Sequence, residues 1–220
     1  MRGIIQTAEQ VRAWLDGRRT TLRVPIKVQP GEYAGGVHPN NKKIHDAPYI
    51  DAYCSEPKTK ANPRGMSDFW CWWTEDDRQG PSIGRCPIGA VGDTIAVREA
   101  WGRWTPCNCG ECSKEPTVYR ATWNGNDPVD RWRSPQHMPL DLVRIHLLIE
   151  SIRVERLQSI SEADCRAEGC PVDDLGGEYC VDGMPSWQAW MMDRWDRTNK
   201  RHPWANNPCC WVAACRRVKP

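Results

Sequence analysis

Hydrophobic and polar residues alternate between Gly89 and Trp101, in the sequence G-A-V-G-D-T-I-A-V-R-E-A-W. This pattern predicts a tight turn at the glycines followed by a strand. Four residues would then share one face of the strand: Ile95, Val97, Glu99 and Trp101. If that face lines the core, Glu99 is a carboxylate at the rim of the core, beside an indole. Such an acid indicates either an ion pair with Arg98, Arg103 or another arginine, or the floor of a pocket.

Three segments have the hydrophobic spacing of helices, and each carries its own start or stop signal. The first begins at Thr7, which fits a capping box with Gln10, and Gly17 is placed to end it. A short helix is predicted over residues 161–169, with Ser161 and Asp164 as a capping pair at its start. A carboxylate in its last turn, Glu168, opposes the helix dipole. A longer amphipathic helix is predicted over residues 185–199. Its apolar stripe contains Trp187, Trp190, Met191 and Trp195.

Alternating residues predict further strands over residues 22–28, 94–101, 117–122, 143–154 and 210–218. In a regular strand, Ile152 and Val154 would face the opposite side of the sheet from Ile149. A bulge near Ser151 would return them to the same side, and this is predicted here. His146 is expected on the outward side of this strand. Several antiparallel strands with helices at the rim favour an α+β fold, built as a small mixed or antiparallel β-barrel with flanking helices.

Residues 29–88 are rich in proline, glycine and asparagine and show little periodicity. They predict a long irregular insertion into a single domain that spans residues 1–220. The insertion contains an aromatic cluster, Phe69 to Trp73, whose expected use is packing under the loop. Stacking on a base is the alternative.

The amino-acid composition limits the classes of binding partner. The chain has 13 Trp but one Phe, and 22 Arg but 8 Lys, which favours planar stacking and forked hydrogen bonds over simple point charges. The net charge is only +2, so nucleic-acid binding would need a local basic patch. No stretch approaches the length of a membrane span, so no membrane partner is expected.

Twelve cysteines without a recognisable signal peptide favour a cytoplasmic protein with reduced thiols or metal ligands. Cys107, Cys109 and Cys112 fall within one loop, predicted over residues 102–116. Three thiolates can reach one ion. Cys86 or Cys71 is the first candidate for a fourth ligand, and His137 is the next. A structural zinc ion and a set of free thiols are both compatible with this spacing.

A basic segment, Arg18 to Arg23, follows the first helix and runs into a strand. It contains three arginines and two hydroxyl residues. Such a helix exit is either a solvated turn or a site for a phosphate or a base edge.

Four segments together resemble the ASCH-domain proteins of bacteriophages and prophages, which belong to the PUA-like superfamily of small β-barrels. These segments are V-R-A-W-L-D-G-R-R-T-T-L-R, G-A-V-G-D-T-I-A-V-R-E-A-W, I-R-V-E-R-L-Q-S-I-S-E-A-D-C-R-A-E-G, and W-D-R-T-N with the downstream N-P-C-C-W-V. The resemblance leaves out residues 29–85, 102–130 and 170–184. It implies RNA or modified-base binding in a cleft between the barrel and a flanking helix.

One ASCH enzyme that this chain resembles removes the acetyl group from N4-acetylcytidine with a Lys, a Thr and a Glu. The resemblance places the Lys at Arg19, the Thr at Leu22 and the Glu at Glu168. Arginine is a poor general base and leucine has no nucleophile, although Thr20 or Thr21 can substitute after a register slip. Another ASCH protein resembles a metal-assisted ribonuclease.

Four functions are compatible with these features of the sequence. The first is a binding module for RNA, DNA or a modified nucleoside. Its predicted contacts are Arg18, Arg23, Arg98, Glu99 and Trp101. The second is an amidohydrolase acting on N4-acylated cytosine, with Glu168 as acid/base and Arg19 at the oxyanion. The others are a nuclease and a phage protein whose Trp-rich insertion contacts a protein partner.

Overall fold

The computed structural model describes most of the chain. The described residues are 2–27, 29, 49–54, 57, 59, 66–73, 79–104, 116–125, 129, 131–175, 179 and 183–219.

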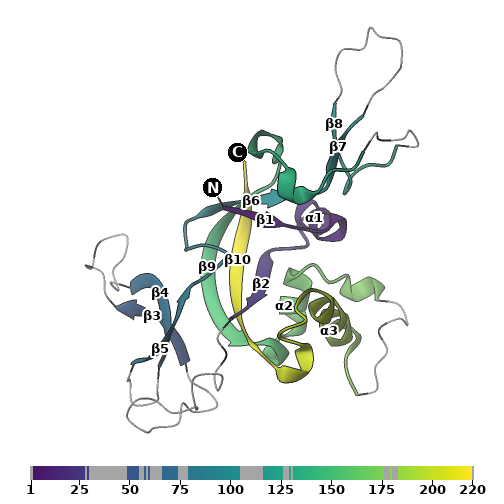
Figure 1. Cartoon of the computed structure of the whole chain (residues 1–220). Helices are drawn as coiled ribbons and strands as arrows, with labels where there is room; N and C mark the ends of the chain where they lie inside the picture. Colours follow the sequence, from purple (N-terminus) through teal and green to yellow (C-terminus); the bar gives the residue numbers. More distant parts are fainter. Residues whose placement is uncertain are drawn as a thin grey trace, which may run out of the picture.

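A five-stranded sheet forms the centre of the molecule (Figure 1). In order across the sheet, its strands are β1 (Arg2–Ile5), β6 (Thr94–Arg98), β9 (His146–Arg156), β10 (Cys209–Val218) and β2 (Thr21–Pro25). Strands β1 and β6 are parallel, whereas the other neighbours are antiparallel. The predicted α+β class with a mostly antiparallel sheet is confirmed.

The sheet of the predicted small β-barrel does not close in the described part of the chain, because β1 and β2 are its two open edges. Helix α1 (Ala8–Leu15) connects the two edge strands. Its buried residues Val11 and Trp14 join the same hydrophobic core as Leu147 and Trp211 from the sheet. The helix thus covers apolar surface of the sheet. In a closed barrel, paired strands would cover it.

The predicted start and stop signals of α1 are confirmed. Thr7 and Gln10 form both hydrogen bonds of a capping box, and Gly17 adopts a φ of 74° just beyond the helix. The basic segment therefore leaves the helix at a defined angle and enters β2.

Strand β6 is shorter than predicted and ends at Arg98. Trp101 instead begins a separate strand, β7 (Trp101–Arg103), which pairs with β8 (Thr117–Tyr119). At the break, the backbone N–H of Glu99 donates to the sulfur of Met138 at 3.4 Å instead of to a strand partner.

The predicted bulge in β9 is confirmed. Ser151 lies opposite Ala214 and Ile149 opposite Cys215, so Glu150 has no counterpart in β10. His146, however, is buried, which corrects the expected outward position. The reason is that its cross-strand partner Ala96 belongs to a small hydrophobic cluster, which covers this face of the sheet.

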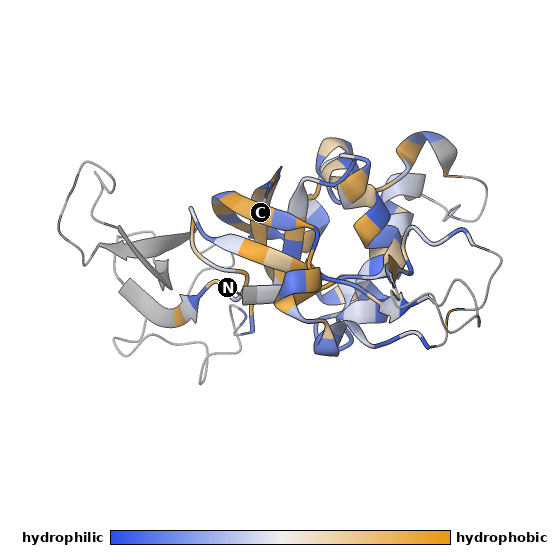
Figure 2. Cartoon of the chain, turned by 90° about the horizontal axis from the view of Figure 1, so that it is seen from above, coloured by the Kyte–Doolittle hydropathy of each residue, from blue (hydrophilic) through white to orange (hydrophobic). Residues whose placement is uncertain are grey.

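Helices α2 (Glu162–Ala167) and α3 (Ser186–Thr198) form a second core with residues that follow β9 and precede β10. The capping pair of Ser161 and Asp164 and the aromatic stripe of α3 are as predicted. Hydrophobic and hydrophilic residues share these helices, as amphipathic elements require (Figure 2). Short 3₁₀ turns complete the chain at Pro135–His137, Leu140–Leu142, Leu157–Ser159, Val172–Asp174 and Trp204–Asn206.

The insertion is more regular than predicted. It contains a three-stranded antiparallel sheet of β3 (Tyr49–Cys54), β4 (Met66–Trp73) and β5 (Gln79–Arg85). Strand β4 carries the aromatic cluster, and aromatic residues favour strands, which explains the missed element. Trp70 packs edge-on against Trp211 of the central sheet, with ring centroids 5.2 Å apart.

No helix in the described part of the chain is long and apolar enough to cross a membrane.

The buried face of β9 provides a test of the core. Leu147→Ala should lower the free energy of unfolding by about 2–5 kcal/mol, because this leucine is fully buried and its loss leaves a cavity. Leu140→Ala is the matched control, since Leu140 is 49% exposed, and should change stability by about 0.5 kcal/mol or less. Urea unfolding measures both. Equal losses would contradict the described packing.

Candidate functional site

Arg19 makes contacts with four parts of the fold through one buried guanidinium group. Its Nη2 donates to Glu168 Oε2 at 3.0 Å, its Nη1 to Gln6 Oε1 at 2.7 Å, and its Nε to the carbonyl of Thr21 at 3.0 Å. The guanidinium also lies 5.6 Å from the centre of the Trp14 ring. Burial lowers the pKa of Arg19 below its ordinary value, and the charge of Glu168 opposes that shift.

Local backbone geometry brings Arg19 to Glu168. The Arg19 N–H donates to the carbonyl of Ala13 at 2.9 Å, so the chain folds back over the end of α1. Glu168 caps the end of α2, and Gly169 follows it with a φ of +94°. A Cβ on Gly169 would lie 3.0 Å from the Cβ of Ala13, which leaves little room for a side chain between the two helix ends. The ion pair of Arg19 with Glu168 thus depends on two helix stops.

A second buried arginine shares the same carboxylate. The side chain of Arg23 is 1% exposed, and its Nη1 lies 2.5 Å from Glu155 Oε1 while its Nε lies 3.7 Å from Glu168 Oε1. Arg153 extends the network at the surface by pairing with Glu155 and with Asp164 of α2. Charges of both signs therefore compensate one another across β2, β9 and α2.

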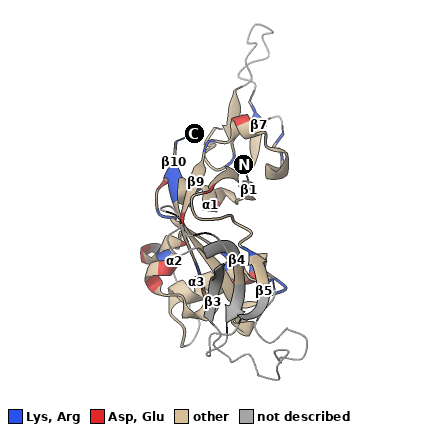
Figure 3. Cartoon of the chain, turned by 90° about the vertical axis from the view of Figure 1, so that its left-hand side faces the viewer, with Lys and Arg blue, Asp and Glu red and all other residues tan. Residues whose placement is uncertain are grey.

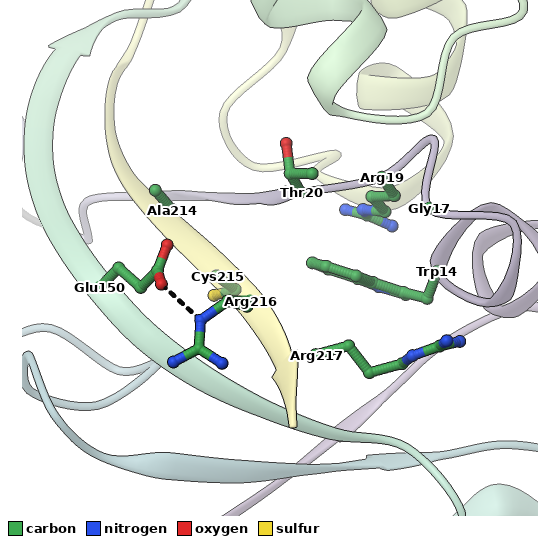
Figure 4. Close-up of a pocket in the computed structure, with 9 residues that line it drawn as sticks. All are labelled: Trp14, Gly17, Arg19, Thr20, Glu150, Ala214, Cys215, Arg216 and Arg217. Carbon is green, nitrogen blue, oxygen red and sulfur yellow. Dashed lines mark hydrogen bonds and ion pairs between the residues drawn. The ribbon is translucent and has the colours of Figure 1, made fainter. Parts of the chain in front are cut away.

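A pocket of about 620 Å³ lies between the end of α1 and strand β10 (Figure 4). It is lined by Trp14, Gly17, Arg19, Thr20, Glu150, Ala214, Cys215, Arg216 and Arg217. The pocket lies where β10 extends beyond the start of β2, so that the turn after α1 forms one wall. Figure 3 shows the basic end of β10, which carries the last two of these arginines.

The pocket combines charged, hydroxyl and apolar groups. Arg216 Nε donates to Glu150 Oε1 at 2.8 Å, and Arg217 Nη1 donates to the carbonyl of Leu15 at 3.1 Å. Thr20 is exposed at the turn. Burial raises the pKa of Cys215 to about 12, with Arg19 opposing the shift, so this thiol stays protonated near neutral pH and is a poor nucleophile.

Only some of the predicted site residues lie at this pocket. Arg19 and Thr20 line it, whereas Glu168 is buried behind Arg19 and is 3% exposed. Thr21 and Arg23 are buried in β2. Arg18 is exposed and donates to the carbonyl of Gly169 and to Asp16.

The residues near the end of β6 form a separate cluster outside the pocket lining. Glu99 is 1% exposed and accepts two hydrogen bonds from Arg144, at 2.7 and 2.9 Å. The prediction of an ion pair with another arginine is therefore confirmed. Trp101 lies under Arg133 at 4.9 Å, and Arg98 donates to the carbonyl of Gln136.

Several residues of the pocket lining were not predicted from the sequence. Trp14, Arg216 and Arg217 were not among the candidate site residues. The change of alternation near Ser151 was the one feature of the sequence that pointed to Glu150. It predicted a bulge, and the bulge leaves Glu150 without a partner in β10.

The proposed zinc ligands Cys107, Cys109 and Cys112 lie outside the described residues, while Cys86 is buried in the core. Among the residues that the structure describes, no group of three or more His, Cys, Asp or Glu side chains could hold a metal ion. The zinc site stays a prediction.

No family model, curated protein or solved structure matches this chain. Function must therefore be inferred from the pocket and its residues.

The buried ion pair provides a test of the network. Glu168→Gln should lower the free energy of unfolding by about 3–5 kcal/mol, because it leaves the buried Arg19 and Arg23 guanidiniums without this counter-charge. Glu162→Gln is the matched control, since Glu162 forms an exposed pair with Arg166 and should lose about 1 kcal/mol or less. Thermal and urea unfolding measure both. A loss below about 1 kcal/mol for Glu168→Gln would contradict the described network.

Proposed function

We propose that this protein binds RNA, DNA or a modified nucleoside in the pocket between α1 and β10. The observation that carries the proposal is the lining of that pocket, which places an indole, a hydroxyl group and three guanidinium groups around one opening. Its volume lies in the range typical of small-ligand sites. The position between the first helix and the sheet also agrees with the cleft that the ASCH resemblance implies.

The charges at the opening favour an anionic ligand. Arg216 and Arg217 are both exposed, and their forked donors suit phosphate oxygens. Because the chain's net charge is only +2, recognition depends on this local group and not on a global field. Ala214 is half-buried and supplies apolar surface for a base, while Trp14 and Cys215 line the pocket from the buried core behind it.

Hydrolysis of an N4-acylated cytosine is the alternative, and the contact between Arg19 and Glu168 favours it. Three nitrogens of Arg19 already donate to protein groups, however, and Glu168 does not line the pocket. These positions suit a structural pair better than an acid/base and an oxyanion donor, so binding is preferred. Release of acetate from N4-acetylcytidine by the purified protein, lost in Glu168→Gln, would reverse that preference.

Binding is tested with fluorescently labelled short single-stranded RNA and DNA, followed by anisotropy across a salt series. Arg217→Gln should weaken binding by about three- to tenfold and reduce the salt slope by about one, because one phosphate contact is lost. Arg197→Gln is the matched control, since Arg197 is exposed on α3 in a pair with Asp193. Its affinity should equal that of the unmodified protein.

Two results would contradict the proposal. One is the absence of binding at low salt to either nucleic acid and to a free modified nucleoside, N4-acetylcytidine. The other is an Arg217→Gln variant that binds as tightly as the Arg197→Gln control.

A further inference from the structure

The bulge in β9 directs one carboxylate to the pocket. Glu150 is the extra residue of the β9–β10 pairing, between Ile149 opposite Cys215 and Ser151 opposite Ala214. An extra residue leaves the ladder and changes the direction of its side chain, and such bulges often lie beside functional sites. The side chain of Glu150 is 48% exposed and lines the pocket from the β9 side (Figure 4).

One oxygen of this carboxylate is occupied and the other is available. Oε1 accepts from Arg216 Nε at 2.8 Å, and no hydrogen bond to Oε2 is formed within the described part of the chain. Figure 4 shows the second oxygen directed away from Arg216. The arginine therefore orients the carboxylate while leaving one acceptor for a ligand.

We propose that Glu150 selects cytosine and adenine, which carry exocyclic amines at N4 and N6, over uracil in this pocket. This inference rests on the proposed function. An ionised carboxylate is an acceptor only, so it accepts from an exocyclic amine such as cytosine N4. Uracil presents a carbonyl oxygen at the same position, which would face Oε2 without a proton between them. Selection therefore combines an attractive contact with a repulsive one.

The experiment compares short labelled oligocytidylate, oligoadenylate and oligouridylate RNA by anisotropy at fixed salt. The unmodified protein should bind the first two about tenfold more tightly than the third, as expected for a charged hydrogen bond gained or lost. An oligonucleotide of N4,N4-dimethylcytidine, which lacks the amine protons, should bind as weakly as oligouridylate.

Glu150→Gln provides the decisive variant. Its carboxamide can donate to the uracil carbonyl as well as accept from an amine, so the preference should fall to about threefold or less. Glu162→Gln is the matched control, because it removes a carboxylate of similar exposure from another Arg–Glu pair outside the pocket. It should keep the tenfold preference. Unfolding midpoints verify that both variants are folded.

The outcomes separate the two proposals. Equal binding of all four oligonucleotides by the unmodified protein, or an unchanged preference in Glu150→Gln, would overturn selection by Glu150 while leaving nucleic-acid binding intact. Failure to bind any of them would overturn both.

Discussion

The buried guanidinium of Arg19 is the interaction on which the arrangement of the fold depends. A charge removed from water must be compensated by partners at fixed positions, and Arg19 finds them in Gln6 beyond β1, Thr21 of β2 and Glu168 beyond α2. Satisfying all three at once fixes the end of one helix against the end of another. The β2 edge of the sheet is thereby held beside α1, and the space between α1 and β10 becomes a defined pocket.

This arrangement divides the charged residues into two groups with different roles. Arg19, Arg23 and Glu168 are buried, and both arginines form an ion pair with this one carboxylate, so they maintain the shape of the site. Glu150 and Arg216 are exposed and only partly engaged, so they remain available to a ligand. A similar division separates Glu99, which is fully buried and bound by Arg144, from the pocket that it was expected to line.

Local signals in the sequence predicted the local parts of the structure. The capping boxes at Thr7 and Ser161 and the change of alternation near Ser151 each depend on residues a few positions apart, and all three are confirmed. Strand β1 and the pocket could not be predicted in this way. The partner of Ile4 is Val97, and the pocket requires the turn after α1 to lie beside β10. Such contacts depend on topology, which no short pattern encodes. The resemblance to ASCH proteins placed Arg19 and Glu168 in one predicted catalytic site. Their burial favours a structural role for the pair instead of a catalytic one.

The position of β10 between β9 and β2 also affects how the protein is made. Val24 pairs with Trp211, so β2 emerges from the ribosome long before β10, its one strand neighbour among the described residues, exists. At typical elongation rates the delay is roughly ten seconds or more. Helix α1 can form in that interval from its own capping signals, whereas the apolar residues of β2 stay uncovered. Assembly of the sheet is therefore a late, non-local event, which makes folding slow and leaves the nascent chain open to chaperones.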